Sequence, residues 1–154
     1  MKFQARKFNQ ESYDYFDKRI KDLWIDFIKD YGFVVTKSDE DYSVDIEAER
    51  NGYKFYFEVE SKSTYSFHDK ESFPFDTVSF AGRKKRLADK FFFWYVIIND
   101  KTKTAIICDS KTIYNEDYTE TININTNQRQ GLDEFYRVPK DKCKFIKLDN
   151  YATT

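Results

Sequence analysis

Histidine is nearly absent from this 154-residue chain, which contains His68 alone. Sites that need two or more imidazoles are therefore excluded, among them zinc proteases, nucleases built on paired metal-binding histidines and most zinc sites. Glycine occurs only four times, and neither GxxxxGK[ST] nor GxGxxG is present. Loops that cradle the phosphates of a nucleotide are therefore not expected.

Cysteine and long apolar segments are also scarce. Cys108 and Cys143 are too few for a disulfide framework and lack the spacing of a metal site, which indicates a reducing compartment. The N-terminal residues lead into no apolar stretch, so no secretory signal is expected. The longest apolar run, residues 91–98, is too short to span a bilayer. We therefore expect a soluble cytoplasmic protein without a membrane partner.

Aromatic residues, by contrast, are abundant: they make up 19% of the chain, and hydrophobic residues make up 40%. At this length the composition supports one domain with its own core, and the bulk of Phe and Tyr favours β-rich packing. The formal net charge is −1, so no global attraction to nucleic acid is expected. The local positive excess peaks at Arg83-Lys84-Lys85-Arg86, which alone is also consistent with a solvated helix face.

Hydrophobic periodicity predicts the order of the elements. Apolar residues at helical spacing predict a helix over residues 11 to about 31, which Gly32 ends. Three strands, a helix carrying the basic cluster and a buried strand are expected next. The three strands are expected at residues 33–38, 41–50 and 53–63. The helix is expected to begin at residue 78 or 79 and to end before residue 91, and the buried strand is expected at residues 91–100. Further strands are expected at residues 102–110 and 144–148, whereas residues 114–130 read as loops or an irregular hairpin.

The dipeptide Asn51-Gly52 predicts a two-residue turn between the second and third strands. This turn fixes the register, which places Ile46 opposite Phe57 and Val44 opposite Val59. One face of the hairpin is then wholly apolar and must pack on a core.

The other face of this hairpin gathers acidic residues. The register places Asp45 opposite Glu58 and diagonally from Glu60, with Ser43 opposite Glu60 and Lys62 at the edge. Opposed residues have Cβ atoms about 5 Å apart, so three carboxylates converge and repel one another. A hard divalent cation with oxygen ligands would turn this repulsion into a site. A solvated face rich in Glu and Lys explains the same pattern, and both interpretations stay open on geometry alone.

Asp45, followed on the next strand by Glu60-Ser61-Lys62, resembles the signature of the PD-(D/E)XK nuclease superfamily: an acid on one strand, then acid-x-Lys on its neighbour. The resemblance covers residues 11–99, where α-β-β-β-α-β is also the element order of the family. It implies a restriction-endonuclease-like α/β fold with a mixed central sheet flanked by helices. Val44 stands where the first motif commonly has Pro.

The resemblance also implies roles for these residues. Asp45, Glu60 and Lys62 would be the catalytic residues. Asp45 and Glu60 would bind Mg²⁺ or Mn²⁺, together with the backbone carbonyl of Ser61. Lys62 would orient or activate the attacking water and stabilise charge on the phosphate. Glu58 matches no required position and would be an optional ligand of a second ion or a neighbour of the ligands.

The second predicted helix lies where the family places a helix beside the active site. Ser79, Arg83 and Lys84 are the residues that we expect to contact the phosphates of a nucleic acid. Lys85 and Arg86 are also nucleic-acid-binding candidates, although an exposed basic helix face suits each of them equally.

The function that follows is a divalent-metal-dependent endonuclease that hydrolyses phosphodiester bonds in DNA, of the repair, recombination or phage DNA-processing type. RNA as the substrate stays open, and a homodimer would supply two sites for paired cuts. The chain is expected to be one nuclease-like domain over residues 1–154, with a core at about 11–110 and an extension, 111–154, packed on it. The host would be a bacterium or a phage-infected cell. A catalytically inactive nucleic-acid-binding module on the same fold is the alternative, and a structural protein with a solvated acidic face is a third.

Overall fold

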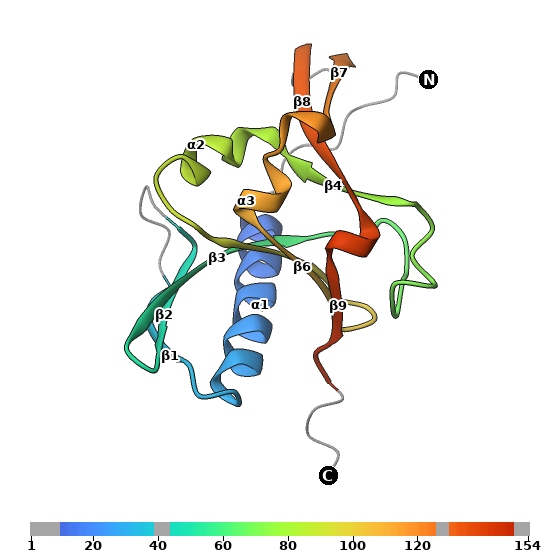
Figure 1. Ribbon diagram of the computed structural model, residues 1–154. Helices are drawn as coiled ribbons and strands as arrows, with labels where there is room; N and C mark the ends of the chain where they lie inside the picture. Colours follow the sequence, from blue (N-terminus) through green and yellow to red (C-terminus); the bar gives the residue numbers. More distant parts are fainter. Residues whose placement is uncertain (1–9, 39–43, 126–129, 150–154) are drawn as a thin grey trace.

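The computed structural model describes residues 10–38, 44–125 and 130–149, whose strands form two sheets (Figure 1). The larger is a six-stranded sheet in the order β1-β2-β3-β5-β6-β9, and the smaller has the order β4-β8-β7. The strands are β1 (Val34–Lys37), β2 (Ile46–Arg50), β3 (Tyr53–Ser61), β4 (Thr77–Ala81), β5 (Trp94–Asn99), β6 (Thr104–Asp109), β7 (Thr119–Asn125), β8 (Gln130–Pro139) and β9 (Lys144–Lys147). The helices are α1 (Gln10–Lys29), α2 (Lys85–Ala88) and α3 (Ser110–Ile113), with 3-10 turns η1 (Gly82–Lys84), η2 (Glu116–Tyr118) and η3 (Lys140–Lys142).

The predicted first helix and its end are confirmed by α1. Gly32 adopts a φ of 87°, in the left-handed region that glycine tolerates best. The N–H of Phe33 donates to the carbonyl of Ile28 at 3.3 Å, and the N–H of Gly32 donates to that of Lys29 at 3.1 Å. This is the hydrogen-bond pattern of a Schellman cap, so the chain leaves the helix at a defined angle and enters β1.

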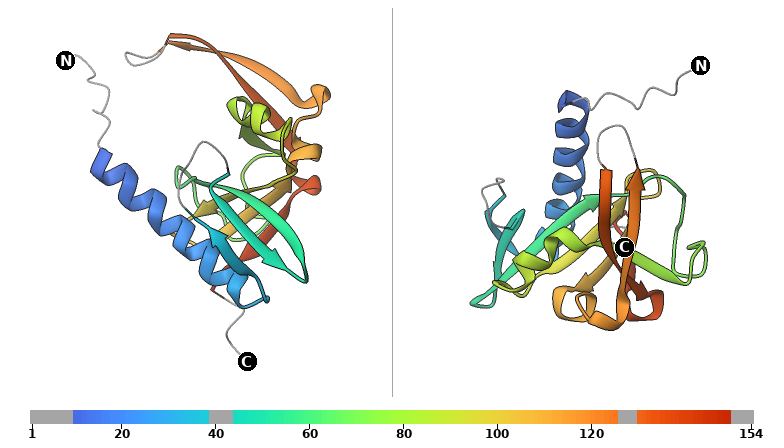
Figure 2. Two further views of the ribbon diagram at one scale, coloured as in Figure 1. Left: turned by 90° about the vertical axis from the view of Figure 1, so that its left-hand side faces the viewer. Right: turned by 90° about the horizontal axis from the view of Figure 1, so that it is seen from above.

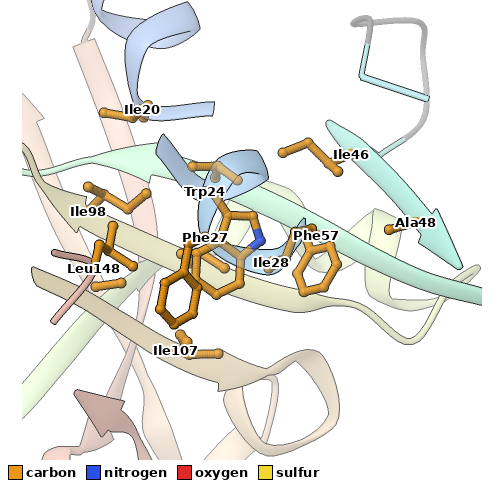
Figure 3. Packing of buried hydrophobic residues seen from close by; sticks show 13 residues of the cluster. Ile20, Trp24, Phe27, Ile28, Ile46, Ala48, Phe57, Ile98, Ile107 and Leu148 are labelled. Atoms are coloured by element: carbon orange, nitrogen blue, oxygen red, sulfur yellow. The ribbon is translucent and has the colours of Figure 1, made fainter. Parts of the chain in front are cut away.

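The apolar stripe of α1 packs on one face of the large sheet and forms the first core (Figure 3). The Trp24 ring lies against Phe27 and Phe57, with centroid distances of 5.4 and 5.5 Å. Ile46 and Ala48 of β2 are fully buried in the same cluster. The apolar face predicted for the hairpin therefore packs on a core, as expected.

The register of that hairpin is also confirmed. Asn51 and Gly52 have φ values of 53° and 82°, which suit the tight turn that matches the twist of two antiparallel strands. Ile46 lies opposite Phe57. Because this register is set, the residues of β3 alternate between the α1 face and the opposite face of the sheet.

The large sheet is mixed, as predicted. β1, β2 and β3 are successive antiparallel strands, and β5 then runs parallel to β3, with Glu58 beside Tyr95 and Glu60 beside Ile97. β6 and β9 continue the sheet in antiparallel fashion, which confirms the strands expected from the apolar segments there. Among the described helices, none is long and apolar enough to cross a membrane.

The predicted second helix is wrong over its first half. Residues 77–81 form β4, which pairs with β8 and places Ser79 opposite Arg137. Val78 and Phe80 are fully buried, so the local period is that of a strand. Only the short η1 and α2 follow, and they carry the basic cluster. The sequence around residue 78 does not reveal this strand because its partner lies almost sixty residues further on.

The two faces of the large sheet are consequently covered by different kinds of layer. α1 covers one face, whereas the small sheet, α3 and the segment after β3 cover the other (Figures 1 and 2). This second core includes Tyr95 and Ile106 of the large sheet and Phe80 and Tyr136 of the small one. The protein is therefore mixed α/β with few helices, and on this second face a small sheet accompanies the short helix α3.

Residues 111–149 contribute to both sheets. β9 completes an edge of the large sheet, and β8 joins β4 to the β7 strand of the small one. The segment at residues 114–130, expected as loops or an irregular hairpin, contains η2 and β7, and β7 pairs with β8. Figure 2 shows that the far end of β7 and β8 projects from the body on the same side as the N-terminal end of α1.

Gly82 directly follows β4 and begins η1. We call η1 and α2, which carry Arg83 to Arg86, the basic segment. The backbone of β8 comes very close to Gly82. A Cβ at this position would lie 2.5 Å from the carbonyl oxygen of Glu134. Because the carbonyl oxygen of Glu134 belongs to the backbone, it can move away only if β8 or the backbone at Gly82 shifts. Gly82 therefore lets η1 rest directly on β8.

We expect Gly82→Ala to destabilise the protein by about 1–3 kcal/mol, the usual cost of forcing extra atoms into a packed site. Urea unfolding followed by the fluorescence of Trp24 and Trp94 measures this change. Asp89→Ala, at an exposed position after α2, is the control and should stay within about 0.5 kcal/mol of wild type. Equal stability of Gly82→Ala and wild type would show that the junction does not depend on this contact.

Candidate functional site

The acidic cluster predicted on the hairpin lies where β2 begins. The N–H of Asp45 donates to Glu58 Oε2 at 2.6 Å, and the N–H of Val59 donates to Asp45 Oδ2 at 3.0 Å. Two side-chain carboxylates thus take the place of backbone acceptors just beyond the regular β2–β3 ladder. The predicted opposition of Asp45 and Glu58 is confirmed, and Glu58 is only 6% exposed.

Glu60 lies on the same face of β3 as Glu58, turned towards the second core. The hydroxyl of Tyr95, on the neighbouring strand β5, donates to Glu60 Oε2. The same hydroxyl accepts the N–H of Ala81 at 3.4 Å, and the hydroxyl of Tyr114 donates to the carbonyl of Ala81 at 2.9 Å. These contacts tie Glu60 to the end of β4, just before the basic segment. Ser43, expected opposite Glu60, lies outside the described residues.

Lysines approach the carboxylates from two sides. Lys84 Nζ lies 3.4 Å from Glu58 Oε1 and 4.8 Å from the centroid of the Tyr95 ring. Lys21 Nζ, on α1, lies 3.6 Å from Asp45 Oδ1 and 2.8 Å from Asp17 Oδ2.

Lys62 follows the end of β3 and is partly buried. Its N–H donates to the carbonyl of Ile98 at 3.0 Å, which holds the residue against β5. Ser61, whose backbone carbonyl the resemblance makes a metal ligand, is the last residue of β3 and is exposed.

The protonation of the cluster is set mainly by burial. The pKa of Glu58 is raised to about 7, chiefly by burial; the Lys84 ammonium opposes this rise and the charge of Asp45 adds to it. Burial lowers the pKa of Lys62, against the opposing effect of the Glu60 carboxylate. Burial and then the charge of Glu60 raise the pKa of Tyr95 and Tyr114, so both hydroxyls stay protonated as hydrogen-bond donors.

The five residues expected to contact nucleic acid, Ser79 and Arg83 to Arg86, have different surroundings in the structure. Lys84 belongs to the cluster, and Arg83 is close enough to influence Tyr114. Lys85 instead pairs with Glu116 at 3.2 Å, and Arg86 is exposed. Ser79 lies within β4, so it does not begin a helix as expected.

Two contributors to the cluster were not predicted from the sequence. Lys21 lies three residues before Trp24 and seven before Ile28, so it belongs to the apolar stripe of α1. A buried lysine at such a position indicates a buried acidic partner. Tyr95 is the residue with a hydroxyl in the run at residues 91–98. Asp17, also on α1, connects to the cluster through Lys21.

The oxygen donors of the cluster suit a hard divalent cation. Mg²⁺ uses one or two carboxylates and keeps several waters, and Asp45 and Glu58 are adjacent carboxylates in a partly buried setting. The pKa of Glu58 is raised chiefly by burial, and Lys21 and Lys84 already lie beside the two carboxylates. Within the described ranges, no group of three or more His, Cys, Asp or Glu side chains is arranged around a common metal position. The residues therefore offer an ion the adjacent pair Asp45 and Glu58, with Glu60 on the same face of β3, and water or substrate would have to complete the coordination.

Comparisons with protein-family models, curated proteins and solved structures give no match to this chain.

The elevated pKa of Glu58 predicts a specific dependence of stability on pH when metal ions are removed with EDTA. Because the pKa is about 7 in the folded protein and ordinarily 4.5, the fold binds this proton more tightly than the unfolded chain does. The stabilisation is complete below about pH 4.5 and is lost as the pH rises through about 7. We expect Glu58→Gln to remove a decline of order 2 kcal/mol between these values.

Free energies of unfolding from urea titrations at several pH values between 4.5 and 8 measure this effect. Glu116→Gln, an exposed partner of Lys85, is the control and should keep the wild-type pH profile. An identical profile for Glu58→Gln and wild type would contradict the assigned burial of this carboxyl group.

Proposed function

We propose that the protein is a divalent-metal-dependent endonuclease that hydrolyses phosphodiester bonds in DNA. The observation that carries this proposal is the cluster of Asp45, Glu58 and Glu60 on adjoining strands, with the partly buried Lys62 two residues beyond Glu60. Carboxylates and a lysine held together away from bulk water are the groups that phosphoryl chemistry with Mg²⁺ requires.

In this proposal Asp45 and Glu60 hold the ion, with Glu58 as an additional ligand or a neighbour that receives the Asp45 N–H. A bound Mg²⁺ or Mn²⁺ would supply a water of lowered pKa and neutralise charge on the phosphate. Lys62 would hold that water or a phosphate oxygen by hydrogen bonding. Its lowered pKa results from burial, so the side chain accepts a proton less readily than an exposed lysine does. Tyr95 fixes the orientation of Glu60 by donating its hydroxyl hydrogen.

The order of elements supports the same proposal. α1, β1, β2 and β3 are followed by a crossover segment and then by β5, which lies parallel to β3. This order agrees with the α-β-β-β-α-β core that the PD-(D/E)XK resemblance implies, except that β4 precedes the short α2. The crossover returns the chain past the carboxylates and brings Lys84 to them.

A second candidate, a nucleic-acid-binding module without catalysis, is favoured by the charges within the cluster. Lys21 and Lys84 each contact one of its carboxylates, and the Lys62 charge interacts with Glu60. An acidic cluster with cations already present needs no metal ion for its stability, so it is also compatible with a fold that only binds phosphates.

A cleavage assay tests the proposal. The purified protein is incubated with plasmid, linear, single-stranded and branched DNA and with RNA, in Mg²⁺, Mn²⁺ or EDTA. We expect metal-dependent cutting that falls at least about a hundredfold in Asp45→Asn, Glu60→Gln and Lys62→Ala, because each loses several kcal/mol of transition-state stabilisation. Glu49→Gln, an exposed acid of the same hairpin, is the control and should cut like wild type.

The outcomes separate the two candidates. Cutting that persists in EDTA, or that survives in all three variants, would contradict the assigned mechanism. Salt-dependent binding to DNA without cutting of any substrate would favour the non-catalytic module instead.

A further inference from the structure

Lys84 reaches the acidic cluster from outside the hairpin and pairs with Glu58. Its ammonium lies 3.4 Å from Glu58 Oε1, and its side chain is only 14% exposed. Glu58 itself is 6% exposed and accepts the N–H of Asp45. The lysine therefore stands where it compensates the carboxylate that burial penalises most.

Contacts with Tyr95 and with β8 determine the position of Lys84. Its ammonium lies over the face of the Tyr95 ring, 4.8 Å from the centroid, where an aromatic ring attracts a cation. The same Tyr95 donates its hydroxyl hydrogen to Glu60. Lys84 ends η1, which rests on β8 through Gly82. Tyr95 thus connects the Lys84 ammonium, which pairs with Glu58, to the second carboxylate, Glu60.

A divalent ion beside Asp45 and Glu58 would have to share this space with the lysine. Like charges a few Å apart in a partly buried setting disfavour each other strongly. Lys21 is the less able of the two contacting lysines to leave, because Asp17 holds it at 2.8 Å on α1 and its side chain is 8% exposed. Lys84 stands on a single turn at the edge of the site, and its long flexible stem gives it the freedom to turn away.

We infer that Lys84 is the internal counter-cation of the carboxylate cluster and that a divalent metal ion competes with it for Glu58. When the ion binds, the Lys84 ammonium leaves Glu58 and becomes available to a phosphate oxygen of the nucleic acid. Metal binding and substrate binding are then coupled through one side chain, because the displaced lysine gains a new anionic partner only when substrate is present. This inference rests on the proposed metal site.

The test is the affinity for Mn²⁺ alone, measured by calorimetric titration and by the paramagnetic resonance of free Mn²⁺. We expect Lys84→Met to bind Mn²⁺ about tenfold or more tightly than wild type, because a competing charge is removed. Lys85→Met is the matched control, since Lys85 pairs with Glu116 instead of the cluster, and its affinity should equal that of wild type. Circular dichroism establishes that the variants are folded.

The outcomes distinguish this inference from the proposed function. If wild type binds Mn²⁺ and Lys84→Met binds it equally or more weakly, the competition is wrong while the metal site stands. If neither protein binds Mn²⁺, the metal site and the inference both fail. If Lys84→Met binds and wild type does not, Lys84 blocks the site completely and the inference holds.

A measurement on the wild-type protein covers the case in which Lys84→Met does not fold. With ¹³C-labelled lysine, the Cε resonance of Lys84 should move towards the position of an exposed lysine when Mg²⁺ is added. The resonance is assigned with Lys84→Arg. A Lys84 resonance that stays unchanged while Mg²⁺ binds would overturn the inference.

Discussion

The two hydrogen bonds between the chain segments at Asp45 and Glu58 are the constraint on which the site depends. Each carboxylate accepts a backbone N–H from the opposite segment, so the hairpin register and the placement of both charges are determined together. Without those N–H donors, two adjacent acids near a core would repel each other and take up protons. Burial still leaves Glu58 with a pKa of about 7, so the hydrogen bonds only partly offset the cost of charge in this position.

The remainder of the site compensates that charge from elements distant in the sequence. α1 brings Lys21 to Asp45, and η1 brings Lys84 to Glu58. Tyr95 fixes Glu60 from the neighbouring strand and also lies beneath the Lys84 ammonium. The position of the basic segment in turn depends on the small sheet, because Gly82 packs directly on the backbone of β8. The hairpin therefore supplies the acids, and the crossover between β3 and β5 supplies Lys84, the cation that we propose to exchange with a metal ion.

Local signals in the sequence were sufficient for the hairpin and insufficient for its surroundings. Asn51-Gly52 has one dominant structural role, and the alternation on both sides of it fixes the register, so the proximity of Asp45 to Glu58 was predictable. β4 was not, because its pairing with β8 joins segments far apart in the chain and overrides the helical tendency of the residues after it. Lys21 and Tyr95 were missed for a related reason: each is a polar group inside an apolar pattern, and its partner is known only once the elements are packed.

The central claim is that the carboxylate cluster is a binding site for a divalent cation. Crystals soaked in Mn²⁺ and measured at the manganese absorption edge test it most directly, because anomalous scattering locates the ion without assumptions about activity. The account predicts a peak within coordination distance of Asp45 and of Glu58 or Glu60, absent from Asp45→Asn crystals. A well-ordered cluster with no peak, and with Lys84 still against Glu58 at saturating Mn²⁺, would contradict it.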